Sequence, residues 1–217
     1  LGLLGMKIGI EYQTHGLTAA NGKRVDEQLN TFAAISDFSG IVDSLRAIKS
    51  PAELDKVRRA AELSDAALER AMPLIKAGAD EGDILAAMHA AIFEGGGDYP
   101  ANEFIIGSGP DALLCRYKAG RRKLDPQDQL TLEWAGVFHH YHAALMRTAV
   151  IGSPTPRHLE LQAASHEALL AVEAAMKPGT SFGDVFQAHA DVMDRHNMTR
   201  HRLNACGYSL GARFTPS

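Results

Sequence analysis

Apolar residues recur at close to helical spacing in the segment that begins at Ser50. Ser50 can cap a helix whose first position is Pro51, and Glu53 stands three residues after the cap, as in a capping box. The apolar positions that follow lie among charges at a period near 3.6, which predicts an amphipathic helix. We expect this helix to run to about Lys76 with a kink at Pro73, because proline removes a helical hydrogen bond.

An internal repeat with an offset of 101 residues is the most informative feature of the chain. The segment 76–84, KAGADEGDI, returns as 177–185, KPGTSFGDV, with lysine, both glycines, aspartate and an apolar residue in matching places. In each copy a helix ends at a glycine, a short polar cap follows at Asp80 or Ser181, and a second helix begins. Helix–glycine–cap–helix connections are common, but the number of residues that match in both copies favours a true repeat. The repeat predicts a pseudo-symmetric domain made of two similar halves.

Between the two copies the pattern changes to that of β-strands. Residues 104–109, FIIGSG, predict a strand that ends in a glycine turn, and residues 125–128 predict a second turn. Residues 129–134 and 137–150 predict the two strands of a hairpin, with Gly136 at the join. The second half would need a matching sheet segment, which this chain lacks. We therefore expect a fragment, or a chain trimmed at both ends.

The first 48 residues follow a different pattern. Residues 7–11 predict a short strand, and residues 15–47 predict a helix, a second short strand and a polar connector. We therefore expect two domains. Residues 1–48 would be the C-terminal remnant of a preceding α/β domain, and residues 49–217 a larger α+β domain that is incomplete at its C-terminus.

Composition narrows the classes of function. The chain has 217 residues, of which 46% are hydrophobic and 22% charged, and its net charge of −4 is ordinary for a globular protein. No basic excess points to nucleic acid or an anionic membrane as a partner. No apolar run reaches the roughly 18 residues of a membrane span. Cys115 and Cys206 lack the spacing of a metal or redox motif, so we expect a reducing, cytoplasmic location.

Several short motifs, in this order and spacing, resemble the pita-bread superfamily of creatinase, prolidase, aminopeptidase P and methionine aminopeptidase. The motifs are IKSPAE at 48–53, IGSG at 106–109, DQLTLE at 128–133, YHAALMRT at 141–148, KPG at 177–179 and CGYSLG at 206–211. The resemblance covers residues 48–217, and residues 1–47 are similar to the end of the family's creatinase-like N-terminal domain. It implies a pita-bread catalytic domain, a small-molecule substrate, and a homodimer in which the N-terminal domain covers a neighbour's pocket.

The resemblance also implies where the family's metal ligands fall. In the metal-dependent members the central hairpin supplies two aspartates and a later strand supplies a histidine. These positions are occupied here by Glu133, Ala144 and Tyr208. Alanine cannot bind a metal, and tyrosine, with an ordinary pKa of about 10, is a poor ligand at neutral pH. Because a two-metal site needs carboxylates and imidazole around its ions, we expect no metal and no other cofactor.

Within the family the sequence most resembles the metal-free branch. It shares the pattern Tyr-x-x-Ala-Leu-x-Arg-Thr with creatinase, but Met146 stands where creatinase has the glutamate that binds the guanidinium. Arg116 falls on or beside the position of creatinase's catalytic histidine. The stretch from Cys115 to Thr148 is most similar to ectoine hydrolase. The resemblance thus implies metal-independent hydrolysis of a C–N bond in a small cyclic amidine or guanidino compound. The alternatives are a metal-dependent Xaa-Pro dipeptidase and a binding module without catalysis.

Strand alternation predicts which side chains share the pocket. If Ala144 faces it, so do His142 and His140, because residues two apart on a strand point to the same side. Glu133 and Tyr208 join them through the family match. A histidine can transfer protons near neutral pH, and a carboxylate can pair with an amidinium. We therefore predict Glu133, His142 and Tyr208 as catalytic residues.

Three further residues are predicted to bind substrate: Arg116, His140 and Cys115. The guanidinium of Arg116 suits a substrate carboxylate because both groups are planar and two-pronged. Each prediction has a structural alternative. Glu133 could be a buried partner of Arg147, Arg116 could pair with Asp111, the two histidines could be satisfied strand residues, and the cysteine could be a small buried hydrophobe. Surface positions are predicted for the basic run 121–123 and for His15, His158, His166, His189, His196 and His201.

Overall fold

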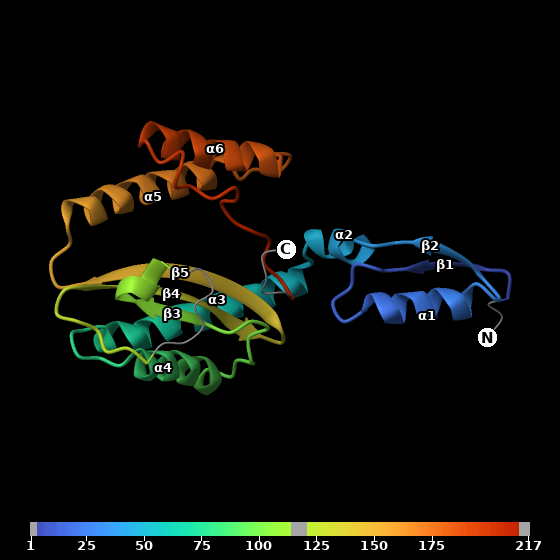
Figure 1. Ribbon diagram of the computed structural model, residues 1–217, viewed down its shortest axis with the longest axis horizontal. Coiled ribbons are helices and arrows are strands. Elements are labelled where there is room, and N and C mark those ends of the chain that lie inside the picture. Colours follow the sequence, from blue (N-terminus) through green and yellow to red (C-terminus); the bar gives the residue numbers. More distant parts are fainter. Residues whose placement is uncertain (1–3, 114–120, 213–217) are drawn as a thin grey trace. The chain divides into compact units, whose positions relative to one another are not determined.

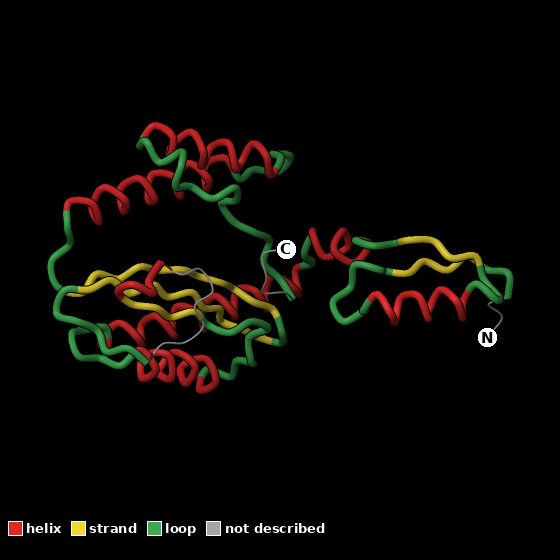
Figure 2. The backbone as a smooth tube through the Cα atoms, in the orientation of Figure 1, coloured by secondary structure: helices red, strands yellow, loops and turns green. Residues whose placement is uncertain are grey.

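The computed structural model describes residues 4–113 and 121–212 (Figure 1 and Figure 2). The chain divides into two compact units, Leu1–Pro51 and Ala52–Ser217. Within the described ranges, no helix combines the length and the apolar character that crossing a membrane would require.

The first unit is a small βαβ arrangement. Strands β1 (Lys7–Ile10) and β2 (Ala34–Asp37) pair in parallel, and helix α1 (Ala19–Leu29) connects them. The segment predicted as a polar connector is instead helix α2 (Ile41–Ala47). Its charges suit a helix, because an acid lies in the first turn and a base in the last, where each complements the helix dipole.

The second unit combines helices with a three-stranded sheet, in agreement with the predicted α+β class. Its elements are α3 (Pro51–Ala71), η1 (Met72–Leu74), α4 (Glu81–Glu94), β3 (Ile105–Ser108), η2 (Gly109–Leu113), β4 (Asp128–Phe138), β5 (Tyr141–Ile151), α5 (Pro156–Ala175) and α6 (Phe182–Arg195). The strand order is β3-β4-β5, and neighbouring strands are antiparallel. Helices α3 and α4 cover one face of this sheet (Figure 1).

The central hairpin turns later than the sequence predicted. Strand β4 continues through Gly136 to Phe138, and the turn consists of His139 and His140, with φ angles of 48° and 65°. Two consecutive positive φ angles are typical of a type I′ turn, whose twist matches that of the strands. Gly136 serves a close contact instead, since a Cβ atom there would lie 1.9 Å from the carbonyl oxygen of Ala60 on α3.

The hydrophobic core lies between the α3–α4 pair and the sheet. Its buried members include Leu63, Ala67, Ile84, Met88, Ile92, Ile106, Leu130, Leu132 and Trp134. Trp134 is fully buried, and its indole N–H donates a hydrogen bond to the carbonyl oxygen of Ser64 at 2.9 Å. The even-numbered residues of β4 therefore point toward the helices, and the odd-numbered residues point toward the opposite face.

Both copies of the repeat form the same helix joint. Asp80 caps α4 by accepting from the N–H of Gly82, and Ser181 caps α6 by accepting from the N–H of Asp184. The helix before the first joint ends earlier than predicted. It stops at Ala71, and its proline lies in the 3₁₀ turn η1 rather than in a kink, because a proline nitrogen cannot continue the helical hydrogen bonding. Helices α5 and α6 form a second packed pair (Figure 2).

Candidate functional site

The sheet face opposite α3 and α4 carries several of the predicted site residues. The register of β4 and β5 pairs Glu133 with Met146, Ala135 with Ala144, and Val137 with His142. Directly paired residues of antiparallel strands point to the same side of a sheet. Glu133, Ala144 and His142 therefore share one face, as strand alternation predicted for His142 and the family resemblance for Glu133.

Glu133 lies on the central strand of this face and is half-buried. Its cross-strand neighbours are Ile105 on β3 and Met146 on β5. Arg147, the structural partner that the sequence left open, pairs with Leu132 and so belongs to the other face. The guanidinium of Arg147 donates to the carbonyl oxygen of Met146 at 2.7 Å. This placement argues against the alternative in which Glu133 is the partner of Arg147.

The residues on this face do not fit the two-metal centre of the metal-dependent members. Ala144 offers no donor atom, and the nearby Met146 offers a thioether, which is a soft ligand unsuited to ions that prefer oxygen. Within residues 4–113 and 121–212, no three His, Cys, Asp or Glu side chains form a group that could hold a metal ion.

His142 lies on the same face but is only 2% exposed. Its Nε2 accepts a hydrogen bond from the backbone N–H of Ala101 at 3.0 Å, and its backbone N–H donates to the carbonyl oxygen of Gly211 at 2.8 Å. Burial is the main cause that lowers the pKa of His142 below its ordinary value, although hydrogen bonding with the backbone of Gly211 and His140 opposes it. A ring nitrogen that accepts a hydrogen bond belongs to a neutral imidazole. These contacts occupy the Nε2 of His142, and they favour the alternative in which His142 is a strand histidine with a structural role.

His140 is not part of the strand on which the alternation argument placed it. It is the second residue of the hairpin turn, its side chain is exposed, and its backbone N–H donates to Oδ2 of Asp98 at 3.1 Å. Strand alternation applies only to extended residues, so it does not extend from His142 to a residue with a positive φ angle. The premise that His140 lies on the strand is therefore wrong, and its role in binding substrate stays a prediction.

Tyr208 lies in the segment after α6, and its residue surface is 41% exposed. Gly211, a little further along, forms an isolated antiparallel bridge with His142. The bridge brings this segment beside the edge of β5, near the end of the sheet where the hairpin turns. The catalytic role of Tyr208 stays a prediction. Cys115 and Arg116 lie outside the described residues, and their roles stay predictions as well.

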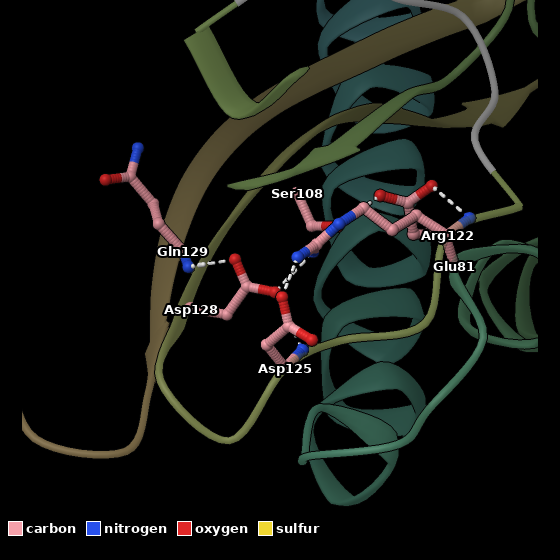
Figure 3. A network of polar contacts seen from close by, with 6 residues as sticks. All are labelled: Glu81, Ser108, Arg122, Asp125, Asp128 and Gln129. Carbon is pink, nitrogen blue, oxygen red and sulfur yellow. Dashed lines mark hydrogen bonds and ion pairs between the residues drawn. The ribbon is translucent and has the colours of Figure 1, made fainter. Parts of the chain in front are cut away.

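A polar network that sequence reasoning missed lies at the other end of the sheet (Figure 3). The hydroxyl of Ser108 donates to Oε1 of Glu81 at 2.6 Å, and Nη1 of Arg122 donates to the same hydroxyl at 2.8 Å. Nη1 of Arg122 also donates to the carboxylate of Asp128. The prediction of a solvated turn at 121–123 is therefore wrong for Arg122. Asp128 was the available signal, because an acid that opens an apolar strand needs a cationic partner when it is buried.

Comparison with known proteins identifies relatives over most of the chain. The model of metallopeptidase family M24 matches residues 55–217. An uncharacterized hydrolase/peptidase of Sinorhizobium fredii is 29% identical over 94% of this chain and 53% of its own length. The ectoine hydrolase of Halomonas elongata is 27% identical, over 85% of this chain and 48% of its own. The Xaa-Pro dipeptidase of Pyrococcus furiosus is 23% identical over 92% of this chain and 58% of its own length. The chain spans about half the length of the curated relatives that it matches.

Solved structures show the same fold. The prolidase from Pyrococcus furiosus superposes with a TM-score of 0.85 at 21% identity, covering 96% of this chain and 61% of that one. The X-Pro aminopeptidase from Thermotoga maritima gives a TM-score of 0.87 at 19% identity, covering 95% and 57%. At such identities the likeness concerns the fold alone, and it confirms the predicted pita-bread architecture.

Proposed function

Because the chain belongs to metallopeptidase family M24, a family of hydrolases, we propose that the complete protein hydrolyses a C–N bond in a small cationic compound without a metal ion. The proposed substrate class is a cyclic amidine carboxylate such as ectoine, or a related guanidino compound. The similarity to an ectoine hydrolase supports this choice. The observation that carries it is the chemistry of the sheet face around Glu133.

One carboxylate dominates that face. By register and alternation its residues are Ile105, Gly107, Gln129, Thr131, Glu133, Ala135, Val137, His142, Ala144, Met146, Thr148 and Val150. Among these described strand residues Glu133 is the one acid. A single carboxylate balances one positive charge, and its two oxygens match the two N–H groups of an amidinium or guanidinium. Two divalent ions would require several carboxylates in the same place.

The proposed roles follow from this placement. Glu133 orients the amidinium so that water can attack its central carbon. The attacking water passes a proton to the leaving nitrogen, and the C–N bond breaks to give an amide or urea and an ammonium group. Tyr208 donates a hydrogen bond to the tetrahedral intermediate, and Arg116 holds the substrate carboxylate. His142 is proposed as a positioning residue rather than as the proton carrier, because its Nε2 already accepts a hydrogen bond from the backbone of Ala101.

The test compares Glu133→Gln with the unaltered complete protein. The protein is incubated with ectoine, creatine and an Xaa-Pro dipeptide, and the products are followed by mass spectrometry. We expect turnover of the cyclic amidine, and a loss of at least about a hundredfold in Glu133→Gln, typical of a positioned catalytic group. Glu69→Gln, at an exposed position on α3, is the matched control and should leave turnover unchanged.

A peptidase is the second candidate, because Xaa-Pro dipeptidases are relatives at 23% and 24% identity. The same assay separates the two reactions. Turnover of the dipeptide alone would overturn our proposal in favour of the peptidase. Turnover of no compound would leave a binding module as the better description.

A further inference from the structure

The polar network at the start of β4 joins four segments of the second unit. Glu81 is the first residue of α4, Ser108 is the last residue of β3, and Asp128 is the first residue of β4. Arg122 lies in the connection that leads to β4 and contacts all three of them. Its backbone N–H donates to Oε2 of Glu81 at 3.2 Å, and its guanidinium donates to Ser108 and to Asp128 (Figure 3).

The network holds charged groups in a nearly dry place. Glu81 and Ser108 are fully buried, the side chain of Asp128 is 3% exposed, and that of Arg122 is 28% exposed. Burial would raise the pKa of Asp128, but hydrogen bonds from Arg122 and from the backbone of Asp125 and Gln129 outweigh it and lower the pKa. Buried ion pairs add little stability compared with apolar residues of equal size, so their presence calls for another reason.

That reason is visible in the sequence of β3. The strand has four residues, IIGS, and its first two are both isoleucine. In the observed register Ile106 and Ser108 point toward the helices, while Ile105 and Gly107 lie on the face of Glu133. A shift by one residue would exchange one isoleucine for the other at the core, which the hydrophobic effect hardly distinguishes. Within the strand, hydrophobic patterning therefore specifies this register weakly, and Phe104, just before the strand, is the apolar residue that favours it.

Within the strand itself, Ser108 is the residue that makes the two registers unequal. Its hydroxyl donates to Glu81 and accepts from Arg122, so both of its hydrogen-bonding roles are satisfied only in the observed register. A shift would remove the hydroxyl and leave the charges of Glu81 and Arg122 buried without it, which is costly. Immediately after β3, the backbone passes close to the guanidinium of Arg122. A Cβ atom at Gly109 would lie 3.0 Å from Cζ of Arg122.

We propose that Arg122 is a positioning residue that fixes the register of β3 against β4 and thereby the surroundings of Glu133. In the observed register Gly107 lies on the Glu133 face, and Ile105 is the direct neighbour of Glu133. A slipped β3 would place Ile106 and Ser108 on that face instead. The inference rests on the proposed function only in naming Glu133 as the group that binds substrate.

Amide hydrogen exchange at residue resolution tests the proposal without any substrate. Arg122→Met removes the guanidinium, and Arg70→Met is the control, because Arg70 pairs with Glu94 on the surface, where both side chains are at least half exposed. We expect Arg122→Met to speed exchange in β3 by about tenfold or more relative to the β4–β5 hairpin, because β3 can open locally while the rest of the sheet stays folded. The control should change neither segment.

Ser108→Ala is a second variant, included in case Arg122→Met fails to fold. It removes the hydroxyl but keeps the Arg122–Asp128 pair. It should speed exchange in β3 in the same selective way, and Arg122→Lys, which keeps the charge, should give an intermediate effect. An equal increase throughout the sheet, or none, would overturn the proposal and leave Arg122 with a purely stabilising role. In the complete protein, a raised KM with little change in kcat for the cationic substrate would add support. If that protein turns over no such substrate, the proposed function fails while the exchange result stands.

Discussion

The buried imidazole of His142 predicts a specific dependence of stability on pH. His142 is 2% exposed, and its Nε2 accepts a hydrogen bond from Ala101, so the folded protein holds the neutral ring. Burial is the main cause that lowers its pKa, with the charge of His140 adding to the effect and that of Asp98 opposing it. Protonation would cost both the hydrogen bond and the solvation of a new charge.

The direction in which stability changes with pH follows from comparing the pKa of His142 in the folded and unfolded states. In the unfolded chain a histidine titrates near pH 6.5, and in the folded protein His142 titrates lower. Its contribution to stability is therefore fully present above about pH 6.5 and is lost as the pH falls toward the folded pKa. Within that window the free energy of unfolding should fall by up to about 1.4 kcal/mol per pH unit from this one group.

Urea denaturation of the wild type and of His142→Gln at about pH 7.5, 6.5 and 5.5 measures the effect. Glutamine does not titrate, and its side-chain oxygen can still accept from Ala101. The lowered pKa values of His89 and His189 act in the same direction, but both residues are present in the two proteins, so the difference isolates His142. Equal slopes for the two proteins would refute the reasoning and would point to a solvated imidazole available for proton transfer.

Two further predictions concern packing and metal content. Gly136→Ala should destabilise the protein by about 3 kcal/mol, at the upper end for overpacking, because the new Cβ would lie 1.9 Å from the carbonyl oxygen of Ala60 and 2.4 Å from the nitrogen of Ser64. Gly207→Ala is the control, since a Cβ there would meet nothing within 4 Å. Equal midpoints of the two variants in thermal denaturation would contradict the prediction. The purified complete protein should carry no stoichiometric divalent metal and should keep its activity in EDTA, because Ala144 cannot ligate; two ions per chain by elemental analysis, with activity lost on chelation, would contradict the assignment.

The sequence predicted the architecture well because the relevant signals are local or repeated. The cap, glycine and acid of each helix joint satisfy backbone groups nearby, so they can be identified without tertiary contacts. The placement of His142 and Ala144 on one face followed from strand alternation, which is a property of the extended backbone, and that of Glu133 followed from the family resemblance. Prediction was less accurate where a contact between residues far apart in the sequence determines the local structure. Gly136 looked like a turn residue, but its role is to let β4 approach the backbone of α3.

The site was less predictable for the same reason. His140 differs from His142 only through its place in the turn, and that place depends on where β4 ends. The environment of Arg122 depends on Asp128, six residues on, and on Glu81, which lies on another element. A run of three basic residues resembles a solvated turn when the buried acids around it are not known. Composition and periodicity carry no information about which of three neighbouring cations turns inward.

Polar contacts hold the sheet near both ends of the central strand, on which Glu133 lies. At one end Arg122 links Asp128 to β3 and α4, and at the other the buried ring of His142 links β5 to the loop at Ala101. Glu133 lies between these two fixed points, on the strand with neighbours on both sides. A carboxylate that binds a small cation gains selectivity only if it does not move to follow a poorly fitting ligand, and such rigidity comes from the supporting residues. We therefore propose that the two polar clusters support one preorganised carboxylate and are not separate sites. Variants at either end should weaken substrate binding at Glu133 even though neither cluster touches the substrate.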